Sequence, residues 1–70
     1  MNWIPTPESS TIARLGYDPD RRVLAVEFKK GSCYEYYDVP INLFEQMRVA
    51  TSKGQFLAQN IKSKYRYALT

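Results

Sequence analysis

The stretch TIARLGYDPDRRVLAVEF, residues 11–28, has the clearest pattern in the chain and predicts a β-hairpin. It consists of two β-rich runs separated by Asp18-Pro19-Asp20, and an aspartate followed by proline is typical of a tight turn. In the second run Leu24, Val26 and Phe28 share one face, because successive side chains of a strand point to opposite sides. We therefore expect this face to be the core side of a sheet.

The residues after the hairpin predict a third strand. Gly31 in the segment KKGS can adopt a positive φ, so the second strand is expected to turn directly into CYEYY. In that strand Tyr34 and Tyr36 lie on one face and Tyr37 on the other. The expected strands, which together form an antiparallel meander, are residues 10–16, 22–29 and 32–38.

A helical spacing of apolar residues follows Pro40. Proline suits the first turn of a helix because its missing N–H has no helical partner there. Apolar residues then recur at intervals of three and four, and Ser52 with Gln55 fits a capping box that starts a second helix. The expected helices are residues 41–50 and 53–64, and the residues expected to meet in one core are Phe28, Phe44, Phe56 and Ile61.

These elements predict an α+β fold in a single domain, residues 1–70, with residues 1–8 as a short N-terminal arm. A three-stranded antiparallel β-meander is followed by two helices packed on one face, in the order β-β-β-α-α. A sheet of this size needs the helices to bury enough apolar area. A chain of 70 residues has room for only a thin core.

Composition excludes several kinds of site. With one cysteine and no histidine, the chain has no intramolecular disulfide and lacks the usual ligands of a structural zinc ion. The three glycines lie far apart in the sequence, so no phosphate-binding loop or dinucleotide fingerprint is present. A serine nucleophile would lack a histidine base. We expect a protein that is not an enzyme and that uses no metal or cofactor.

Hydropathy gives an expectation about localisation. The segment MNWIPTPESS is polar and interrupted by proline, unlike a signal peptide. No run approaches the roughly 18 apolar residues of a membrane-spanning helix. We expect a cytoplasmic protein without a membrane partner.

Charge is distributed unevenly along the chain. The first 45 residues contain seven acidic and five basic side chains, whereas the last 25 contain five basic side chains and no acidic one. If these five gather on one face, their field favours phosphates or an acidic partner. The alternative is an ordinary solvated helix face followed by a basic terminus.

The order of motifs resembles a known family. The paired Ser9-Ser10, the GYD of residues 16–18, the Y-x-Y of Tyr34 and Tyr36 leading into Val39-Pro40, and the SKG of residues 52–54 followed by Phe56 are similar to the KTSC domain. This module is named from its occurrence at the C-terminus of some bacterial lysyl-tRNA synthetases, and the chain also resembles stand-alone bacterial or phage members. The resemblance implies binding of nucleic acid, chiefly RNA.

Aromatic and basic residues form the candidate site. Unpaired bases stack on exposed aromatic rings while lysine and arginine bind phosphates, and Lys53-Gly54 lies at a helix start that favours anions. We expect weak binding, without strong sequence specificity, of RNA or another phosphate-bearing ligand. The candidate residues are Tyr34, Tyr36, Tyr37, Lys53, Gly54, Asn60, Lys62, Lys64 and Arg66.

Other roles for the same residues remain open at this point. The strand tyrosines can be half-buried parts of the sheet with their hydroxyls at its rim. Ser52, Lys53 and Gly54 can form an ordinary turn between helices. The chain can also be a protein-interaction module, either a homodimer or an inhibitor of a host factor, joined through a sheet edge or through Trp3-Ile4. A small nucleotide is a further candidate ligand.

Overall fold

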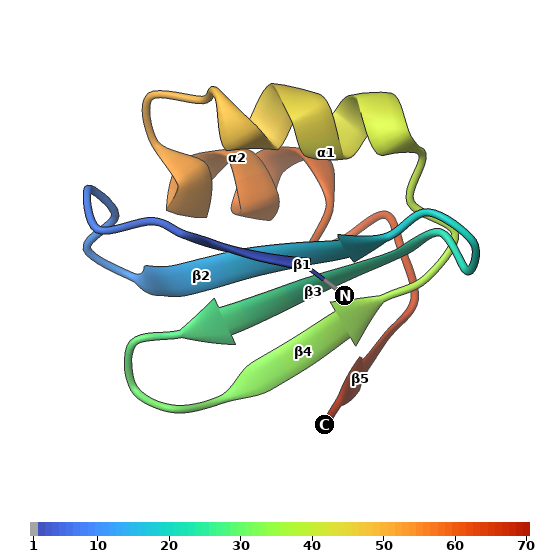
Figure 1. Cartoon of the computed structure of the whole chain (residues 1–70), viewed down its shortest axis with the longest axis horizontal. Coiled ribbons are helices and arrows are strands. Elements are labelled where there is room, and N and C mark those ends of the chain that lie inside the picture. Colours follow the sequence, from blue (N-terminus) through green and yellow to red (C-terminus); the bar gives the residue numbers. More distant parts are fainter. Residues whose placement is uncertain (1) are drawn as a thin grey trace.

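The computed structural model describes residues 2–70, which form one antiparallel sheet covered on one face by two helices (Figure 1). The five strands lie in the order β1-β2-β3-β4-β5, which is also their order in the chain. The strands are β1 Asn2–Pro5, β2 Ile12–Asp18, β3 Val23–Phe28, β4 Cys33–Tyr36 and β5 Tyr67–Leu69. The helices, which lie between β4 and β5 in the chain, are α1 Ile41–Arg48 and α2 Lys53–Asn60.

The predicted hairpin is confirmed as β2 and β3. Its turn is held by Asp18, whose side-chain oxygen accepts hydrogen bonds from the backbone N–H of Asp20 at 3.1 Å and of Arg21 at 3.4 Å. Leu15 of β2 lies opposite Val26 of β3, and both are buried on the helix side of the sheet. The alternation along the sequence therefore assigned the core face correctly.

The turn between β3 and β4 depends on Gly31. Its φ is +109°, a conformation that residues with a Cβ rarely adopt, and its N–H donates to the carbonyl oxygen of Phe28 at 2.9 Å. β4 is shorter than expected, because Tyr37 donates its N–H to Arg66 and Asp38 turns the chain with a φ of +60°. Tyr34 and Tyr36 of β4 lie opposite Val26 and Leu24 of β3, on one face as predicted, and this face is the core side of the sheet.

The prediction of three strands is wrong, because β1 and β5 extend the sheet at both edges. β1 occupies the segment expected as an arm and pairs with β2, for example Ile4 opposite Leu15. β5 returns after the helices and pairs with β4, with Tyr67 opposite Tyr36. Both strands are too short for alternation to reveal them, and the proline of β1, Pro5, is tolerated only because that strand is an edge.

The helices begin where they were predicted to begin but end earlier. Pro40 is the N-cap residue of α1, and the side chain of Ser52 caps α2 by accepting from the N–H of Gln55 at 3.4 Å. α2 ends at Asn60 instead of residue 64. There the N–H of Lys62 reaches back to the carbonyl oxygen of Leu57 at 2.8 Å, which closes the helix and frees the chain to return as β5.

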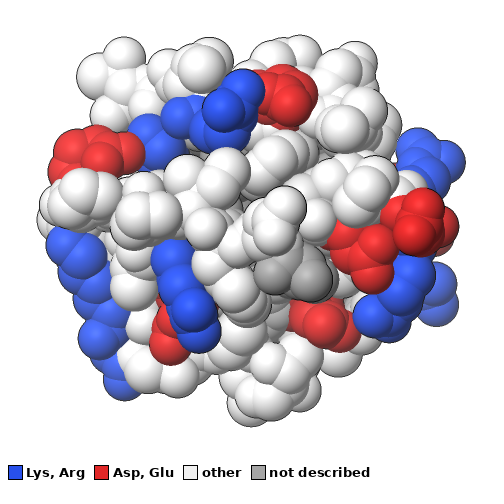
Figure 2. Space-filling view, in the orientation of Figure 1, with Lys and Arg blue, Asp and Glu red and all other residues white. Residues whose placement is uncertain are grey.

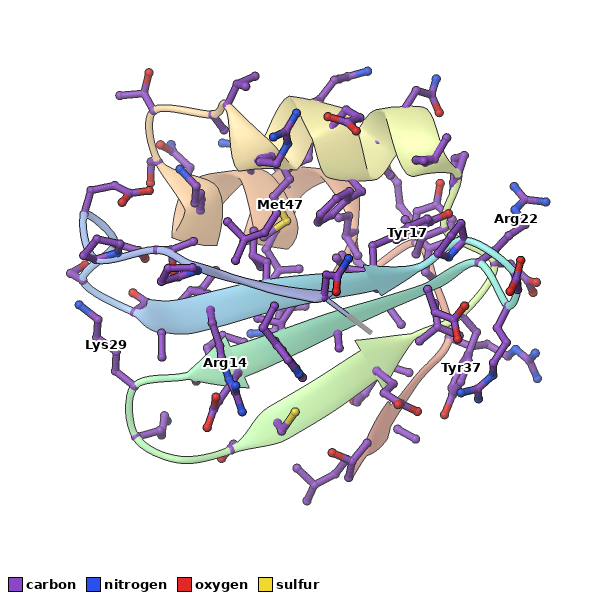
Figure 3. The ribbon with its side chains drawn as sticks, viewed as in Figure 1. Arg14, Tyr17, Arg22, Lys29, Tyr37 and Met47 are labelled. Carbon is purple, nitrogen blue, oxygen red and sulfur yellow. The ribbon has the colours of Figure 1, made fainter. Side chains whose placement is uncertain are left out.

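The core lies between the helices and the inner face of the sheet, with Met47 of α1 directed into it (Figure 3). Leu57 and Ile61 are buried from the second helix and its C-cap, and Phe44 joins them from the first. Phe44 and Ile61 are thus confirmed as core residues. Phe28 and Phe56 are only partly buried against this cluster, so the fully buried position of α2 is Leu57 and not Phe56.

Candidate functional site

Four aromatic rings gather on the helix side of the sheet, towards the β4–β5 edge. This aromatic cluster consists of Phe28, Tyr34, Tyr36 and Tyr67. The ring centroids of Tyr34 and Tyr67 are 5.6 Å apart, those of Tyr36 and Tyr67 are 5.7 Å apart, and Phe28 meets Tyr34 edge to face at 5.7 Å. These distances lie in the range of favourable aromatic contacts, so the rings support one another.

The tyrosines of this cluster differ strongly in exposure. Tyr36 is 2% exposed and belongs to the core, whereas Tyr34 is half-buried. Tyr67 of the edge strand is 57% exposed. Tyr36 therefore has the structural role that the sequence left open for the strand tyrosines. The ring that is exposed to solvent, as ligand contact requires, belongs to Tyr67, which was not among the candidate residues.

The aromatic cluster lines a pocket of about 240 Å³, here called the aromatic pocket. Its rim includes Lys30 from the β3–β4 turn and Lys62 from the segment after α2. Both lysines are exposed, and neither forms an ion pair within residues 2–70. The pocket thus combines aromatic surface with two positive charges that no acidic side chain neutralises. The residues that complete its lining are Thr11 and Ser32.

Basic side chains also lie at the end of the sheet where β3 turns into β4. Figure 2 shows lysine and arginine side chains along the lower left edge of the molecule, where Figure 3 places Lys29 at the β3–β4 turn. Lys29 and Lys30 are both exposed in this turn. The positive field at the aromatic pocket therefore comes partly from the first 45 residues, which carry more acidic than basic side chains.

A second hollow of about 280 Å³, here called the polar pocket, lies at the start of α2. It shares Thr11, Phe28 and Lys62 with the aromatic pocket, so the two are adjacent. Gly54 lines it and faces Thr11, and a Cβ added there would lie 3.6 Å from the Thr11 hydroxyl, an ordinary contact distance. Packing in the fold therefore does not require glycine at position 54.

Lys53 lies beside this hollow but is not available as an exposed charge. Its residue is 8% exposed, and its Nζ atom is 2.6 Å from a carboxylate oxygen of Glu8 and 3.2 Å from the carbonyl oxygen of Ala50. The hydrogen bond from Lys53 lowers the pKa of Glu8 below its usual value. Lys53 therefore fastens the segment before β2 to the start of α2, a role that sequence reasoning did not assign to it.

The remaining candidate residues lie in different places. Asn60 donates a side-chain hydrogen bond to the carbonyl oxygen of Phe56 at 3.2 Å, which closes the last turn of α2. Lys64 and Arg66 line a shallow hollow of the segment between α2 and β5 together with Lys62. Tyr37 lies at the end of the sheet far from Lys29 (Figure 3), with the Arg66 guanidinium 5.9 Å from its ring centroid.

The structure thus brings together Tyr34, Tyr36 and Lys62 out of the candidate residues, and adds three that sequence reasoning missed. These three are Phe28, Lys30 and Tyr67. Phe28 was assigned to the core. Lys30 lies in a turn within the first 45 residues, which carry more acidic than basic side chains. Tyr67 was missed because β5 was missed, although Tyr67 and Leu69 have the alternation of a strand.

The burial of Tyr36 predicts an alkaline limit to stability. Burial raises the pKa of Tyr36, and the neighbouring Tyr34 and Tyr67 raise it further. The folded state therefore holds this proton more tightly than the unfolded state, whose tyrosines ionise near pH 10.0. Stability contributed by the neutral phenol is complete below pH 10 and is lost as the pH rises towards the folded pKa.

We expect Tyr36→Phe to lose less stability than the parent between pH 9 and pH 11, because it has no proton to release at this position. Urea unfolding followed by circular dichroism at intervals across this range measures the difference. Tyr17, whose pKa burial also raises, remains in both proteins and supplies a common background. Parallel pH profiles for the two proteins would contradict the assignment of Tyr36 to the core.

Two further observations concern metals and membranes. Among residues 2–70, no group of three or more histidine, cysteine, aspartate or glutamate side chains is placed to hold a metal ion. Neither helix of this part of the chain has the length and apolar character needed to cross a membrane.

Comparison with known proteins assigns the family. The KTSC domain family matches residues 8–65, which is most of the chain. The chain belongs to the KTSC domain family. The crystal structure of a KTSC domain protein from Yersinia pestis has a TM-score of 0.90 and 36% sequence identity, with 99% of this chain and 96% of that chain covered. The resemblance expected from the sequence is confirmed, and with it the existence of stand-alone members.

The relatives of this KTSC domain are of two sizes. A lysine–tRNA ligase of a Nostoc species is 41% identical over 61 residues, which are 87% of this chain and 11% of the ligase. A protein of Tsukamurella paurometabola is 41% identical over 59 residues, with 84% of this chain and 88% of that protein covered. The KTSC domain therefore occurs both as a small part of a lysine–tRNA ligase and as nearly an entire protein.

Proposed function

We propose that this KTSC domain binds single-stranded RNA through the aromatic pocket. The observation that carries the proposal is the exposed ring of Tyr67 beside Tyr34, flanked by Lys30 and Lys62, which have no acidic partner within residues 2–70. An unpaired base stacks on an exposed aromatic ring, and lysines at the rim bind the phosphates on either side of it. Neither interaction requires a particular base.

The shape of the site favours an unpaired base over a duplex. The rings line a hollow at the edge of the domain, and a base enters a hollow only when it is released from its own stack. Lys30 and Lys62 lie on exposed segments outside the sheet, where they can reach the phosphates of a nucleic-acid strand that passes over the pocket. The match to a lysine–tRNA ligase, a protein whose name refers to an RNA, adds independent support for an RNA ligand.

The exposed tyrosine gives the proposal a direct test. We expect Tyr67→Ala to weaken binding of a single-stranded RNA oligonucleotide by about 1–3 kcal/mol, the usual contribution of one base–aromatic stack. Its thermal stability should fall only modestly, because Tyr67 is 57% exposed and its ring packs against Tyr34 and Tyr36 at the edge of the sheet. Fluorescence anisotropy with labelled single-stranded RNA, double-stranded RNA and single-stranded DNA measures the effect and the preference among the three.

Leu69→Ala is the matched control. Leu69 lies two residues along the same strand, has a similar exposure of 66%, and does not line the aromatic pocket. It should bind RNA as the parent does. If Tyr67→Ala and Leu69→Ala bind RNA equally well, the aromatic pocket is not the binding site.

A protein partner is the second candidate, and one observation favours it. Tyr67 and Leu69 expose apolar surface on the edge strand β5, and an edge strand presents unpaired backbone groups to another chain. Such an interface is mainly apolar and so depends little on salt. Sedimentation velocity at low and high salt distinguishes a protein partner from an RNA ligand. Self-association that persists in high salt and disappears in Leu69→Lys favours the protein partner.

A further inference from the structure

The aromatic pocket and the polar pocket lie side by side, and together they are here called the groove. Thr11, Phe28 and Lys62 line both hollows, so Lys62 stands at the junction between the aromatic end and the polar end. The hollows measure about 240 and 280 Å³, and each alone lies below the roughly 300–1,000 Å³ of typical small-molecule sites. A ligand the size of a dinucleotide would therefore extend across the junction.

The polar end has hydrogen-bonding groups that the fold does not use. The hydroxyl of Ser9 accepts from two backbone N–H groups and that of Ser52 caps α2, so both are already engaged. The side chains of Ser10, Thr11 and Gln55 are exposed and line the same hollow. Hydroxyl and amide groups both donate and accept, as a ribose and the edge of a base require.

The far side of the polar pocket carries an acidic group. Glu8 lines this hollow, and its carboxylate is half exposed even while it is paired with Lys53. A second phosphate placed there would meet a carboxylate whose only cationic partner in the pocket, Lys53, is already bound to it. The position suited to the phosphate that joins two nucleotides is therefore Lys62, with the aromatic hollow on one side and the polar hollow on the other, while Lys30 borders only the aromatic pocket.

We propose that the groove binds two successive nucleotides of a single strand, an inference that rests on the proposed function. The first base occupies the aromatic pocket against Tyr67, the phosphate that joins the two nucleotides lies at Lys62, and the second nucleoside occupies the polar pocket. Gln55 and Ser10, which line only the polar pocket, contact this second nucleoside. The chemical class of the ligand is thus a dinucleoside monophosphate within a longer RNA.

The test measures affinity as a function of ligand length. Adenosine 5′-monophosphate, ApA, ApApA and a tetranucleotide of the same series compete with labelled single-stranded RNA in an anisotropy assay. We expect ApA to bind at least about tenfold more tightly than the mononucleotide, because each carries one phosphate and only ApA has a second nucleoside to fill the polar hollow. ApApA adds a second phosphate that Lys30 can contact, and binding per site should not strengthen further beyond the trinucleotide.

Variants assign each half of the groove. Tyr67→Ala should weaken every ligand in the series, whereas Ser10→Ala combined with Gln55→Ala, two residues that line only the polar pocket, should weaken ApA and longer ligands and leave the mononucleotide unchanged. Equal affinity for the mononucleotide and ApA, or an equal effect of the polar-pocket variant on both, would overturn the two-nucleotide groove alone. If the parent does not bind single-stranded RNA at low salt, the proposed function fails as well.

Discussion

Replacing Leu57 with alanine is expected to lower the free energy of unfolding by about 2–5 kcal/mol, the usual range for truncation of a fully buried leucine. Leu57 is 2% exposed and lies in the cluster with Met47 and Ile61, between the helices and the sheet. Small domains have about 5–15 kcal/mol of stability in total. Urea unfolding followed by circular dichroism should therefore show a large shift of the midpoint.

Phe56 provides the comparison for this prediction. Its larger side chain would make it the more sensitive position if both residues were buried equally, since phenylalanine truncation in a core costs about 3–5 kcal/mol. Phe56 is only partly buried, so Phe56→Ala should be the milder of the two changes. A greater loss of stability in Phe56→Ala than in Leu57→Ala would contradict the described orientation of α2.

Reversing the charge of the two lysines at the rim of the aromatic pocket is expected to abolish RNA binding. A hydrogen bond to a charged group is worth about 1.5–3 kcal/mol, so loss of two such contacts weakens binding by at least about 100-fold. The change is Lys30→Glu with Lys62→Glu. Both side chains are exposed and lack an ion pair within the described residues, so the fold should be retained.

The matched control is Arg21→Glu with Arg48→Glu. It has the same net charge as the lysine variant, and its two residues are exposed and line neither pocket. Arg48 pairs with Glu45 on the surface of α1, and exposed pairs of this kind contribute little to stability. If the control loses binding as strongly as the lysine variant, net charge alone governs the interaction and the pocket does not.

Lys53 shows why such a test could not be designed from the sequence. Its position at a helix start, in a basic part of the chain, suggests an exposed phosphate contact. In the structure it is buried and bound to Glu8, a residue 45 positions earlier. Lys53→Glu would place a carboxylate at a buried position next to the carboxylate of Glu8. A loss of RNA binding in this variant would therefore not distinguish unfolding from the loss of a phosphate contact.

The hairpin, β4 and the starts of both helices were predicted correctly, and the two edge strands were not. The hairpin of β2 and β3 has clear alternation and a turn whose aspartate and proline fix its position. Both helices have a stripe of apolar residues and an identifiable start. β1 and β5 have four and three residues, too few for a periodic signal, and each becomes a strand only by pairing with a neighbour that is already formed.

The candidate site was predicted in part for the same reason. Tyr34, Tyr36 and Lys62 were identified because tyrosines and lysines are visible as residue types, and all three line the aromatic pocket. Tyr67 reaches the pocket through β5, and Lys30 reaches it through the β3–β4 turn. These placements depend on contacts between distant parts of the chain. That the domain is not an enzyme and that it acts in the cytoplasm stay predictions.

The salt dependence of RNA affinity tests the central claim most directly. Anisotropy titrations of the parent with a single-stranded oligonucleotide, at four or more salt concentrations, give the slope of log affinity against log salt. Two phosphate contacts to a single strand predict a slope of about −1.4, and the variant with Lys30→Glu and Lys62→Glu should show no measurable binding on which to define one. Affinity that does not change with salt, or a parent that fails to bind at the lowest salt, would contradict the account.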